Sequence, residues 1–244
     1  MPHKSPTQRL HNQVALVTGA TRGIGLAIAR ALAAESCNLI ITGRDQSALN
    51  RASRELASPK IKILAHPCDL RDPQSITDLF AAVLKQFKRI DILINNAGIA
   101  HPNFIVDKLP LQLWRDVIDT NLTGTFLITQ SALPMMKRGA TIVNNLSVAA
   151  NRVFAGSAAY IASKHGALGL TNTLREELRP QGIRVIALVP GATNTEIWKT
   201  FWPDAPRKKM MSPATIATAL VNAILLPPTA TVETLEILPT VGLL

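Results

Sequence analysis

The sequence predicts an α/β protein in which one doubly wound domain holds a seven-stranded parallel sheet flanked by helices. Seven short runs are strand-like and mostly apolar along their length, and longer segments separate them, several with helical spacing. Strands of this kind are buried on both faces, which favours a parallel sheet covered by helices on each side. The predicted strands are 14–18, 38–42, 61–65, 92–96, 141–147, 183–190 and 234–238.

The clearest helical segments between these strands are 24–36 and 73–87. Asp72 directly before Pro73 is typical of a helix that begins with a capping side chain and a proline in its first turn. No repeat or low-complexity linker interrupts the alternation of strands and helices. We therefore expect a single domain over 13–244, preceded by a polar N-terminal extension over 1–12.

One long segment, 191–211, breaks the alternation and is predicted to be irregular. It carries several prolines, Trp198, Trp202 and a run of three basic residues. A long apolar loop inside a compact domain is usually a lid or a binding loop. We expect this segment to be a substrate loop, in which the two tryptophans either cover the substrate or pack against the protein.

The composition indicates a soluble protein of a reducing compartment. Of the 244 residues 47% are hydrophobic, which is enough to bury one large core. Two cysteines, Cys37 and Cys68, are too few for a disulfide framework and are expected to be ordinary buried thiols. The N-terminus has no apolar core of a secretion signal, and no long apolar run suggests a membrane span. We expect a cytoplasmic protein with no membrane association and no metal site.

The net charge of +10 raises the question of an acidic partner. The basic residues are scattered, with Lys137-Arg138 and Arg207-Lys208-Lys209 as the densest groups, and aromatic residues rarely stand between them. This distribution argues against nucleic-acid binding. An anionic cofactor or an acidic carrier is a better use of the charge, and solubility alone would also explain it.

A glycine-rich motif follows the first predicted strand. The segment TGATRGIG (18–25) runs from that strand into a helix. Gly19 would permit the tight turn, Gly23 would let the backbone approach a pyrophosphate, and Gly25 would let helix and strand pack closely. The helix N-terminus adds the positive end of its dipole. The motif predicts a dinucleotide site, although a glycine-rich turn between strand and helix can also be purely structural.

The end of the second strand indicates which dinucleotide fits. Gly43 occupies the position where a carboxylate would favour NAD, and Arg44 follows it. Arg44 and Arg22 could together bind the 2′-phosphate of NADP. The acidic Asp45 next to them weakens this interpretation, and both arginines could instead be solvated loop residues. We expect NADPH or NADP as the cofactor, with NAD less favoured.

Polar residues also follow the third and fourth strands. Asp69 could accept a hydrogen bond from the adenine amino group, or it could cap the next helix. Asn95 and Asn96 end an apolar strand and need partners, which could be a cofactor ribose or a structural network.

Tyr160 is the only tyrosine of the chain, and its position predicts chemistry. Lys164 stands four residues later on the same helix face, and Ser147 ends the fifth strand at the sheet edge where ligands bind in such folds. A phenol has a pKa near 10, and a nearby ammonium and an oxidised nicotinamide would stabilise the tyrosinate and bring this pKa toward the operating range. Tyr160 could then deliver a proton to a carbonyl oxygen to which Ser147 donates a hydrogen bond.

With these motifs in order, the sequence resembles the short-chain dehydrogenase/reductase family, and the match runs from about Leu10 to Leu238. TGATRGIG matches the nucleotide loop of the family, NNAG (95–98) its structural signature, Ser147 with YIASK (160–164) its active-site pattern, and Pro190-Gly191 with Thr195 its segment beside the nicotinamide. The resemblance implies a Rossmann-type fold. It adds Asn121 as the fourth member of the catalytic set, holding a water that links Lys164 to solvent.

The resemblance completes two sets of expected residues. The catalytic set is Asn121, Ser147, Tyr160 and Lys164. The cofactor-binding set is Gly19, Thr21, Arg22, Gly23, Ile24, Gly25, Arg44, Asp69, Leu70, Asn96, Ala97, Gly98, Tyr160, Lys164, Pro190, Gly191, Thr193 and Thr195.

Two departures from the family pattern bear on function. NLSVAA, around Ser147, lacks the second serine that many members have before the catalytic one. The C-terminus, TLEILPTVGLL, lacks the glycine pair common in the tetrameric acyl-carrier-protein reductases. SPATIATALVNAILLPP (212–228) followed by TVETLEILPT (231–240) looks closer to members that act on small hydroxy acids, aldehydes or ketones, or that have no assigned substrate.

Three functions follow as hypotheses. The first is an NADPH-dependent carbonyl reductase that acts on a small-molecule ketone or aldehyde, or in reverse on an alcohol. The second is a 3-oxoacyl-[acyl-carrier-protein] reductase that would bind its acidic carrier through surface bases such as Arg138 and Arg175. The third is a non-catalytic NADPH-sensing regulator, which the complete catalytic set disfavours. The resemblance implies a homodimer or homotetramer, and His101 and His165 are interpreted as structural.

Overall fold

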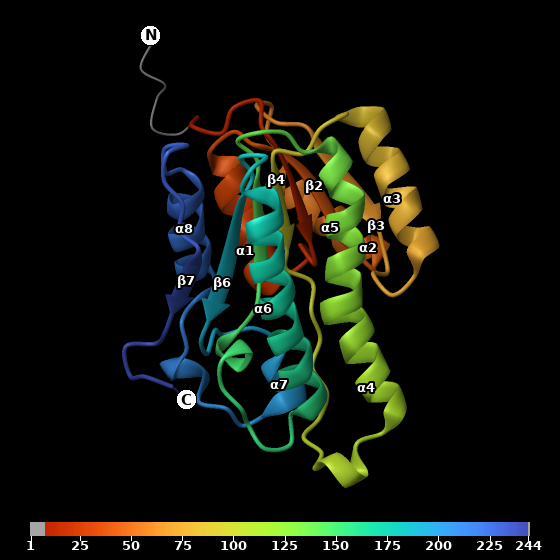
Figure 1. The fold of residues 1–244 in the computed structure, drawn as a ribbon, viewed down its shortest axis with the longest axis vertical. Helices are drawn as coiled ribbons and strands as arrows, with labels where there is room; N and C mark the ends of the chain where they lie inside the picture. Colours follow the sequence, from red (N-terminus) through yellow and green to blue (C-terminus); the bar gives the residue numbers. More distant parts are fainter. Residues whose placement is uncertain (1–7, 244) are drawn as a thin grey trace.

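The protein has a seven-stranded, entirely parallel sheet with helices on both faces, as the sequence predicts (Figure 1). The computed structural model describes residues 8–243, so residues 1–7 of the expected N-terminal extension lie outside the described residues. The strand order is β3-β2-β1-β4-β5-β6-β7. The strands are β1 (Val14–Thr18), β2 (Asn38–Gly43), β3 (Ile63–Pro67), β4 (Ile92–Asn95), β5 (Thr141–Asn145), β6 (Arg184–Pro190) and β7 (Thr234–Ile237).

The helices divide between the two faces of the sheet. Helices α1, α2 and α8 contribute to one apolar cluster with the sheet, and α3, α5 and α6 contribute to another. The α-helices are α1 (Gly23–Ala34), α2 (Gln46–Leu56), α3 (Pro73–Gln86), α4 (Leu111–Ile118), α5 (Gly124–Ala132), α6 (Ala158–Leu178), α7 (Trp198–Phe201) and α8 (Pro213–Ile224). Short 3-10 turns are η1 (Val106–Lys108), η3 (Leu133–Met135), η4 (Val148–Ala150) and η5 (Arg207–Lys209), and η2 (Asp119–Thr123) is a π-helix.

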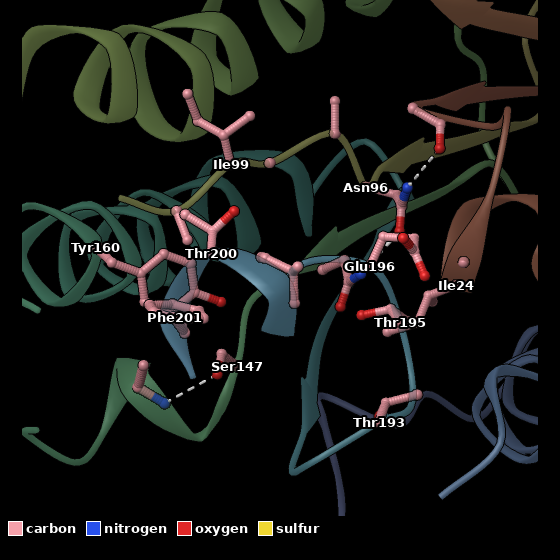
Figure 2. A pocket seen from close by; sticks show the side chains of 18 of the residues that line it. Ile24, Asn96, Ile99, Ser147, Tyr160, Thr193, Thr195, Glu196, Thr200 and Phe201 are labelled. Atoms are coloured by element: carbon pink, nitrogen blue, oxygen red, sulfur yellow. Dashed lines mark hydrogen bonds between the residues drawn. The ribbon is translucent and has the colours of Figure 1, made fainter. Parts of the chain in front are cut away.

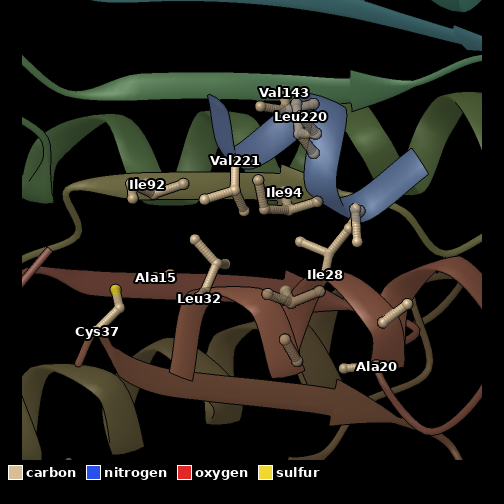
Figure 3. Packing of buried hydrophobic residues seen from close by; sticks show 14 of the residues in the cluster. Ala15, Ala20, Ile28, Leu32, Cys37, Ile92, Ile94, Val143, Leu220 and Val221 are labelled. Carbon is tan, nitrogen blue, oxygen red and sulfur yellow. The ribbon is translucent and has the colours of Figure 1, made fainter. Parts of the chain in front are cut away.

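Strand β1 shows why the sheet is apolar throughout. Ala15 and Val17 belong to the cluster under α1 and α8, whereas Val14 and Leu16 belong to the cluster on the other face. Successive side chains of a strand point to opposite faces, so a strand covered on both sides needs apolar residues at every position. Figure 3 shows Ile28 and Leu32 of α1 and Leu220 and Val221 of α8 over the strands of the first face.

The side-chain cap predicted at the start of one helix is confirmed. The Asp72 side chain accepts a hydrogen bond from the backbone N–H of Gln74, and Pro73 begins α3. The third strand, however, lies two residues later than predicted, at Ile63–Pro67 instead of 61–65. The reason is pairing: Leu39 of β2 aligns with Ile63, and hydrophobicity alone does not set this register.

The prediction of an irregular segment over 191–211 was too simple. It contains helix α7 and turn η5, and a parallel bridge joins Thr193 to Met211 at its two ends. Because of this bridge, the segment forms a closed loop that begins at the end of β6. It therefore holds α7 in a defined position beside the sheet edge.

The sheet reverses its winding between β1 and β4, since the chain passes from β3 at one edge back to β4 beside β1. The loops after β1 and β4 therefore leave in opposite directions, and a crevice opens at the carboxyl ends of the strands. The predicted functional motifs all follow strand ends or line this edge.

Candidate active site

A cavity of about 750 Å³ lies at the carboxyl ends of the strands. Residues that follow or end β1 to β6 all contribute to its wall, together with α7. The structure brings the predicted site residues together here, with two exceptions. Gly25 and Asn121 are buried beside the cavity rather than part of its wall.

The glycine motif forms a turn that has little room for side chains at Gly19 and Gly23. Gly19 and Gly23 have φ angles of +64° and +57°, a region that favours glycine. A Cβ at Gly19 would lie 2.9 Å from the Cα of Ala97, and one at Gly23 would lie 3.3 Å from the Thr195 methyl. The backbone after β1 is thus open to a ligand directly before the N-terminus of α1, which is where a dinucleotide pyrophosphate fits.

Asn96 holds this turn in place. Its amide Nδ2 donates to the carbonyl oxygens of Thr18, at 2.9 Å, and Gly19, at 3.2 Å. Its backbone N–H donates to the Thr18 hydroxyl at 2.9 Å. For Asn96 these hydrogen bonds support the structural interpretation of NNAG. Its side chain holds the turn that forms the predicted cofactor loop.

Asn95 belongs to the structural network alone. It is buried, and its Nδ2 donates to Asn144 Oδ1 and Thr129 Oγ1, both at 2.9 Å. Asn144 in turn donates to Thr171 Oγ1 at 2.9 Å. This ladder ties β4 and β5 to helices α5 and α6 below the cavity.

Arg22 and Arg44 line the cavity and are exposed. Among the described residues neither guanidinium has a carboxylate within 4.0 Å, so both charges are available to a phosphate. Asp45, the acid that weakened the NADP interpretation, is occupied elsewhere. Its carboxylate accepts hydrogen bonds from the Ser47 hydroxyl and the Ala48 N–H at the start of α2, and these lower its pKa.

Asp69 lines the cavity but does not cap α3, which Asp72 does. Its carboxylate is held by the Arg71 guanidinium, with 2.7 Å between Oδ2 and the nearer terminal nitrogen. These hydrogen bonds lower the pKa of Asp69, and the charge of Arg44 contributes as well. A carboxylate kept ionised beside the cavity remains an acceptor for an amino group.

Tyr160, Ser147 and Lys164 all line the cavity. Figure 2 shows Tyr160 and Ser147 in the half away from Ile24 and Thr195. Burial raises the pKa of Tyr160 to about 12, and the neighbouring Ser147 hydroxyl opposes this rise. Burial lowers the pKa of Lys164 to about 8. The Lys164 Nζ lies 5.6 Å from the centre of the Tyr160 ring and donates to the Asn145 carbonyl at 2.8 Å. The ammonium is therefore fixed beside the phenol.

Asn121 lies in the π-helix η2 and supports the cavity from behind. Its side-chain amide pairs with the backbone of Ile99, at 2.8 and 2.9 Å, and donates to Ser163 Oγ at 3.0 Å. A Cβ at Gly98 would lie 3.4 Å from Asn121 Oδ1 and 3.8 Å from Lys164 Nζ, so these three residues adjoin one another. Because both N–H bonds of its side-chain amide are engaged, any water that Asn121 holds would have to donate a hydrogen bond to one of its oxygens.

Comparison with known proteins agrees with this geometry. Residues 13–206 match the short chain dehydrogenase family. The chain belongs to the short-chain dehydrogenase family. The chain is therefore an oxidoreductase that acts on CH–OH or C=O groups.

Three proteins illustrate the similarity. A 3-oxoacyl-[acyl-carrier-protein] reductase of Synechocystis is 37% identical over 76% of this chain and 76% of its own length. The alcohol dehydrogenase of Thermococcus sibiricus, solved with 5-hydroxy-NADP, superposes with a TM-score of 0.87 at 28% identity, over 93% of this chain and 97% of its own. A 3-ketoacyl-(acyl-carrier-protein) reductase of Brucella melitensis, solved with NADH, gives 0.85 at 28% identity, over 95% and 98%.

Sequence reasoning missed Asn145 of this short-chain dehydrogenase. Its Nδ2 donates to Asn96 Oδ1 at 2.8 Å, while its carbonyl accepts from Lys164. One residue thus connects the lysine to the asparagine that holds the glycine turn. The pair Asn144-Asn145 was visible in the sequence, but which of the two faces the cavity depends on strand pairing.

The aromatic lining of the cavity was expected only in part. Trp198 and Trp202 line it, as the lid interpretation suggested, and so do Phe154 and Phe201, which no motif indicated. The Phe201 ring meets the Tyr160 ring edge-on, with centroids 4.8 Å apart. Packing against Tyr160 therefore comes from the far end of α7.

Several residues with reactive side chains lie outside the cavity wall. His101 is buried and its Nδ1 is 2.7 Å from the Pro102 carbonyl, whereas His165 is exposed. Burial raises the pKa of Cys37 to about 12. Residues 8–243 contain no cluster of His, Cys, Asp or Glu side chains suited to a metal ion. Over the same residues, no helix has the length and apolar character that a bilayer crossing requires.

Proposed function

We propose that this chain is an NADP(H)-dependent oxidoreductase that reduces a ketone or aldehyde to an alcohol, and catalyses the reverse reaction. The observation that carries the proposal is the meeting of Tyr160, Ser147 and Lys164 in the same cavity as the glycine turn. The two halves of this cavity supply what the reaction needs: a place for a dinucleotide and a proton donor beside it.

The residues of the nucleotide half fit NADPH. The turn from Gly19 to Gly25 leaves room for the pyrophosphate. The guanidinium groups of Arg22 and Arg44, which have no carboxylate partner within residues 8–243, suit the 2′-phosphate. Asp69 and Leu70 would contact the adenine. Asn96, Ala97 and Gly98 would line the ribose, and the segment from Pro190 to Thr195 would adjoin the nicotinamide. When bound, NADPH supplies the hydride.

Tyr160 would donate the proton in reduction. With a pKa raised by burial, its hydroxyl is protonated at neutral pH and can give that proton to a carbonyl oxygen. Ser147 would donate a hydrogen bond to the same oxygen. The tyrosinate that remains is stabilised by the Lys164 ammonium, whose position is fixed by the Asn145 carbonyl. Asn121 acts as a positioning residue, because it joins Ile99 to the helix that carries Tyr160 and Lys164.

The experiment is a titration with NADPH and NADH, followed by loss of reduced-nicotinamide absorbance with a panel of ketones and aldehydes. Wild-type protein should turn over with NADPH, and Tyr160→Phe should lower kcat by about 10²–10⁴-fold while still binding NADPH. Tight binding without turnover on any carbonyl would favour an NADPH-sensing regulator, and no binding would refute both functions.

A carrier-linked reductase is the second candidate, because the Synechocystis relative bears that name. The sequence hypothesis named surface bases such as Arg138 and Arg175 for carrier binding, and their positions in the structure disfavour both. Arg138 precedes β5, at the opposite end of the sheet from the cavity, and Arg175 is engaged with the Glu233 carbonyl at 2.7 Å. Exposed Lys208 and Lys209, within segment 191–211, are better placed for an acidic carrier. Steep salt dependence with a carrier-bound substrate would support this candidate.

Two further expectations belong to the proposal. A homodimer or homotetramer is supported by the exposed apolar side chains Leu111 and Trp114 of α4 and Phe126 of α5. A cytoplasmic location is supported by two unpaired buried cysteines and the absence of any other cysteine in the sequence.

A further inference from the structure

The two halves of the cavity differ in charge. The charged side chains of its wall are Arg22, Arg44, Asp69, Lys164 and Glu196. Arg44 and Asp69 follow β2 and β3, and Arg22 belongs to the glycine turn. Figure 2 shows Glu196 beside Thr195 and Ile24, on the nucleotide side. Only Lys164 belongs to the half around Tyr160, and its ammonium is engaged with the Asn145 carbonyl.

The wall around Tyr160 is apolar and largely aromatic. Phe201 meets Tyr160 edge-on, and its ring centroid lies 6.1 Å from that of Trp198. Trp198 and Trp202 follow, with centroids 6.4 Å apart. The indole N–H of Trp198 donates to the Thr193 carbonyl at 2.9 Å, so it has no proton to offer a ligand. The apolar residues lining this half are Ile99, Ala100, Val148, Ala149, Phe154, Ala155, Ile197, Trp198, Phe201 and Trp202.

The polar side chains in this half, apart from Ser147, Tyr160 and Lys164, are neutral. Asn103 and Ser157 line the cavity and lie 3.5 Å from each other through Oδ1 and Oγ, and Thr200 lies on α7. None of these can neutralise a carboxylate, and the one cation of this half, the Lys164 ammonium, is held at the Asn145 carbonyl. A carboxylate buried against the aromatic wall would lose its hydration without a cation of that wall to pair with.

We propose that the substrate is an uncharged ketone or aldehyde that carries an aryl or branched apolar group beside the carbonyl, and that the site selects against carboxylate-bearing analogues. This inference rests on the proposed function and adds its substrate class. Aromatic groups pack well edge-on or offset against Phe and Trp side chains, and a mainly apolar pocket with few polar groups fixes their orientation. The same argument disfavours small hydroxy acids, which the C-terminal pattern left open.

The kinetic test uses acetophenone and 4-acetylbenzoate, which share a carbonyl and differ by one carboxylate. We expect kcat/KM with NADPH to be at least about tenfold higher for acetophenone. Phe154→Arg places a cation on the cavity wall and should narrow or reverse this ratio. Val153→Arg is the matched control: it adds the same charge one residue away, at a side chain that is 77% exposed and outside the wall, and should leave the ratio unchanged. Equal or better use of 4-acetylbenzoate by the wild type would overturn the proposal.

A binding test separates this inference from the proposed function. Benzamide and 4-carbamoylbenzoate resemble the two ketones and cannot be reduced in the same way, so calorimetric titration in the presence of NADPH measures selectivity without turnover. We expect benzamide to bind at least about tenfold more tightly. Failure of benzamide to bind, or tighter binding of the carboxylate, would overturn the inference. This preference without turnover of any carbonyl would support the inferred selectivity while refuting the proposed function.

Discussion

At the scale of single residues, the main feature is a buried lysine beside a buried tyrosine. Lys164 has one hydrogen-bond acceptor, the Asn145 carbonyl, and no carboxylate partner among the described residues. Its ammonium is therefore poorly compensated for the loss of water, and the pKa falls to about 8. A lysine in this state remains charged at neutral pH and gives up its proton readily, which suits a group that stabilises tyrosinate.

The depressed pKa of Lys164 should make the free energy of unfolding depend on pH. Its folded pKa lies below the unfolded value of about 10.4, so between these values the unfolded chain binds more protons and the free energy of unfolding rises with pH. Lys164→Met lacks this contribution. From pH 7 to 9.5 the wild type should gain about 2 kcal/mol relative to the variant, as measured by urea denaturation without cofactor. Parallel pH profiles would mean that the Lys164 pKa is not depressed.

At this scale the sequence was informative where spacing along one element decides the geometry. Tyr160 and Lys164 share a helix, so their proximity follows from a separation of four residues. Asn145 could not be found in this way, because its contacts with Asn96 and Lys164 join three different elements. The contact of Phe201 with Tyr160 likewise depends on where α7 lies, and no local pattern fixes that.

At the scale of elements, the strands were predictable and their ends were not. The apolar runs identify which segments are buried on both faces, and this alone indicates seven parallel strands. The shift of β3 arises from its register with β2, which is a tertiary property. Helix α7 was missed because four residues are too short to show a helical period.

The junction of β1, α1 and β4 gives the prediction at this scale. A Cβ at Gly25 would overlap Asn96 Nδ2 and the Gly19 carbonyl, which are hydrogen-bonded to each other. Gly25→Ala should therefore lower the free energy of unfolding by about 1–3 kcal/mol and weaken NADPH binding, because the turn must shift. Urea denaturation and a cofactor titration measure the two effects.

Gly169 in helix α6 is the matched control for this substitution. A Cβ there would meet nothing within 4 Å, so Gly169→Ala should raise the free energy of unfolding by about 0.5–1 kcal/mol through helix propensity. NADPH binding should not change. A similar loss of stability in both variants would show that the effect at Gly25 is not the contact with Asn96.

At the scale of the whole molecule, the excess of ten positive charges raises the question of how charge contributes to cofactor binding. Much of the surface charge is paired locally: Arg71 with Asp69 and Asp116, and Arg179 with Glu176 and Glu233. Arg22 and Arg44 at the cavity lack such partners among the described residues. A general positive field attracts any anion, whereas two guanidinium groups at one end of the cavity select a particular phosphate.

These two explanations make different predictions for Arg44 and Arg51. Both are exposed arginines, in or near α2, but only Arg44 lines the cavity. Removing either changes the net charge equally, so a general field predicts equal losses of NADPH affinity from Arg44→Ala and Arg51→Ala. Local phosphate binding predicts that Arg44→Ala alone raises the NADPH Kd, by about tenfold or more, with little change for NADH.

Fluorescence titration of each variant with both cofactors measures this difference. The dependence of each Kd on salt concentration provides a second test. A direct phosphate contact makes the NADPH Kd rise with ionic strength more steeply than the NADH Kd, and Arg44→Ala should bring the two slopes together. Equal losses in the two variants would refute the local explanation. The preference for NADP(H) would then have to arise from residues other than the arginine that follows β2.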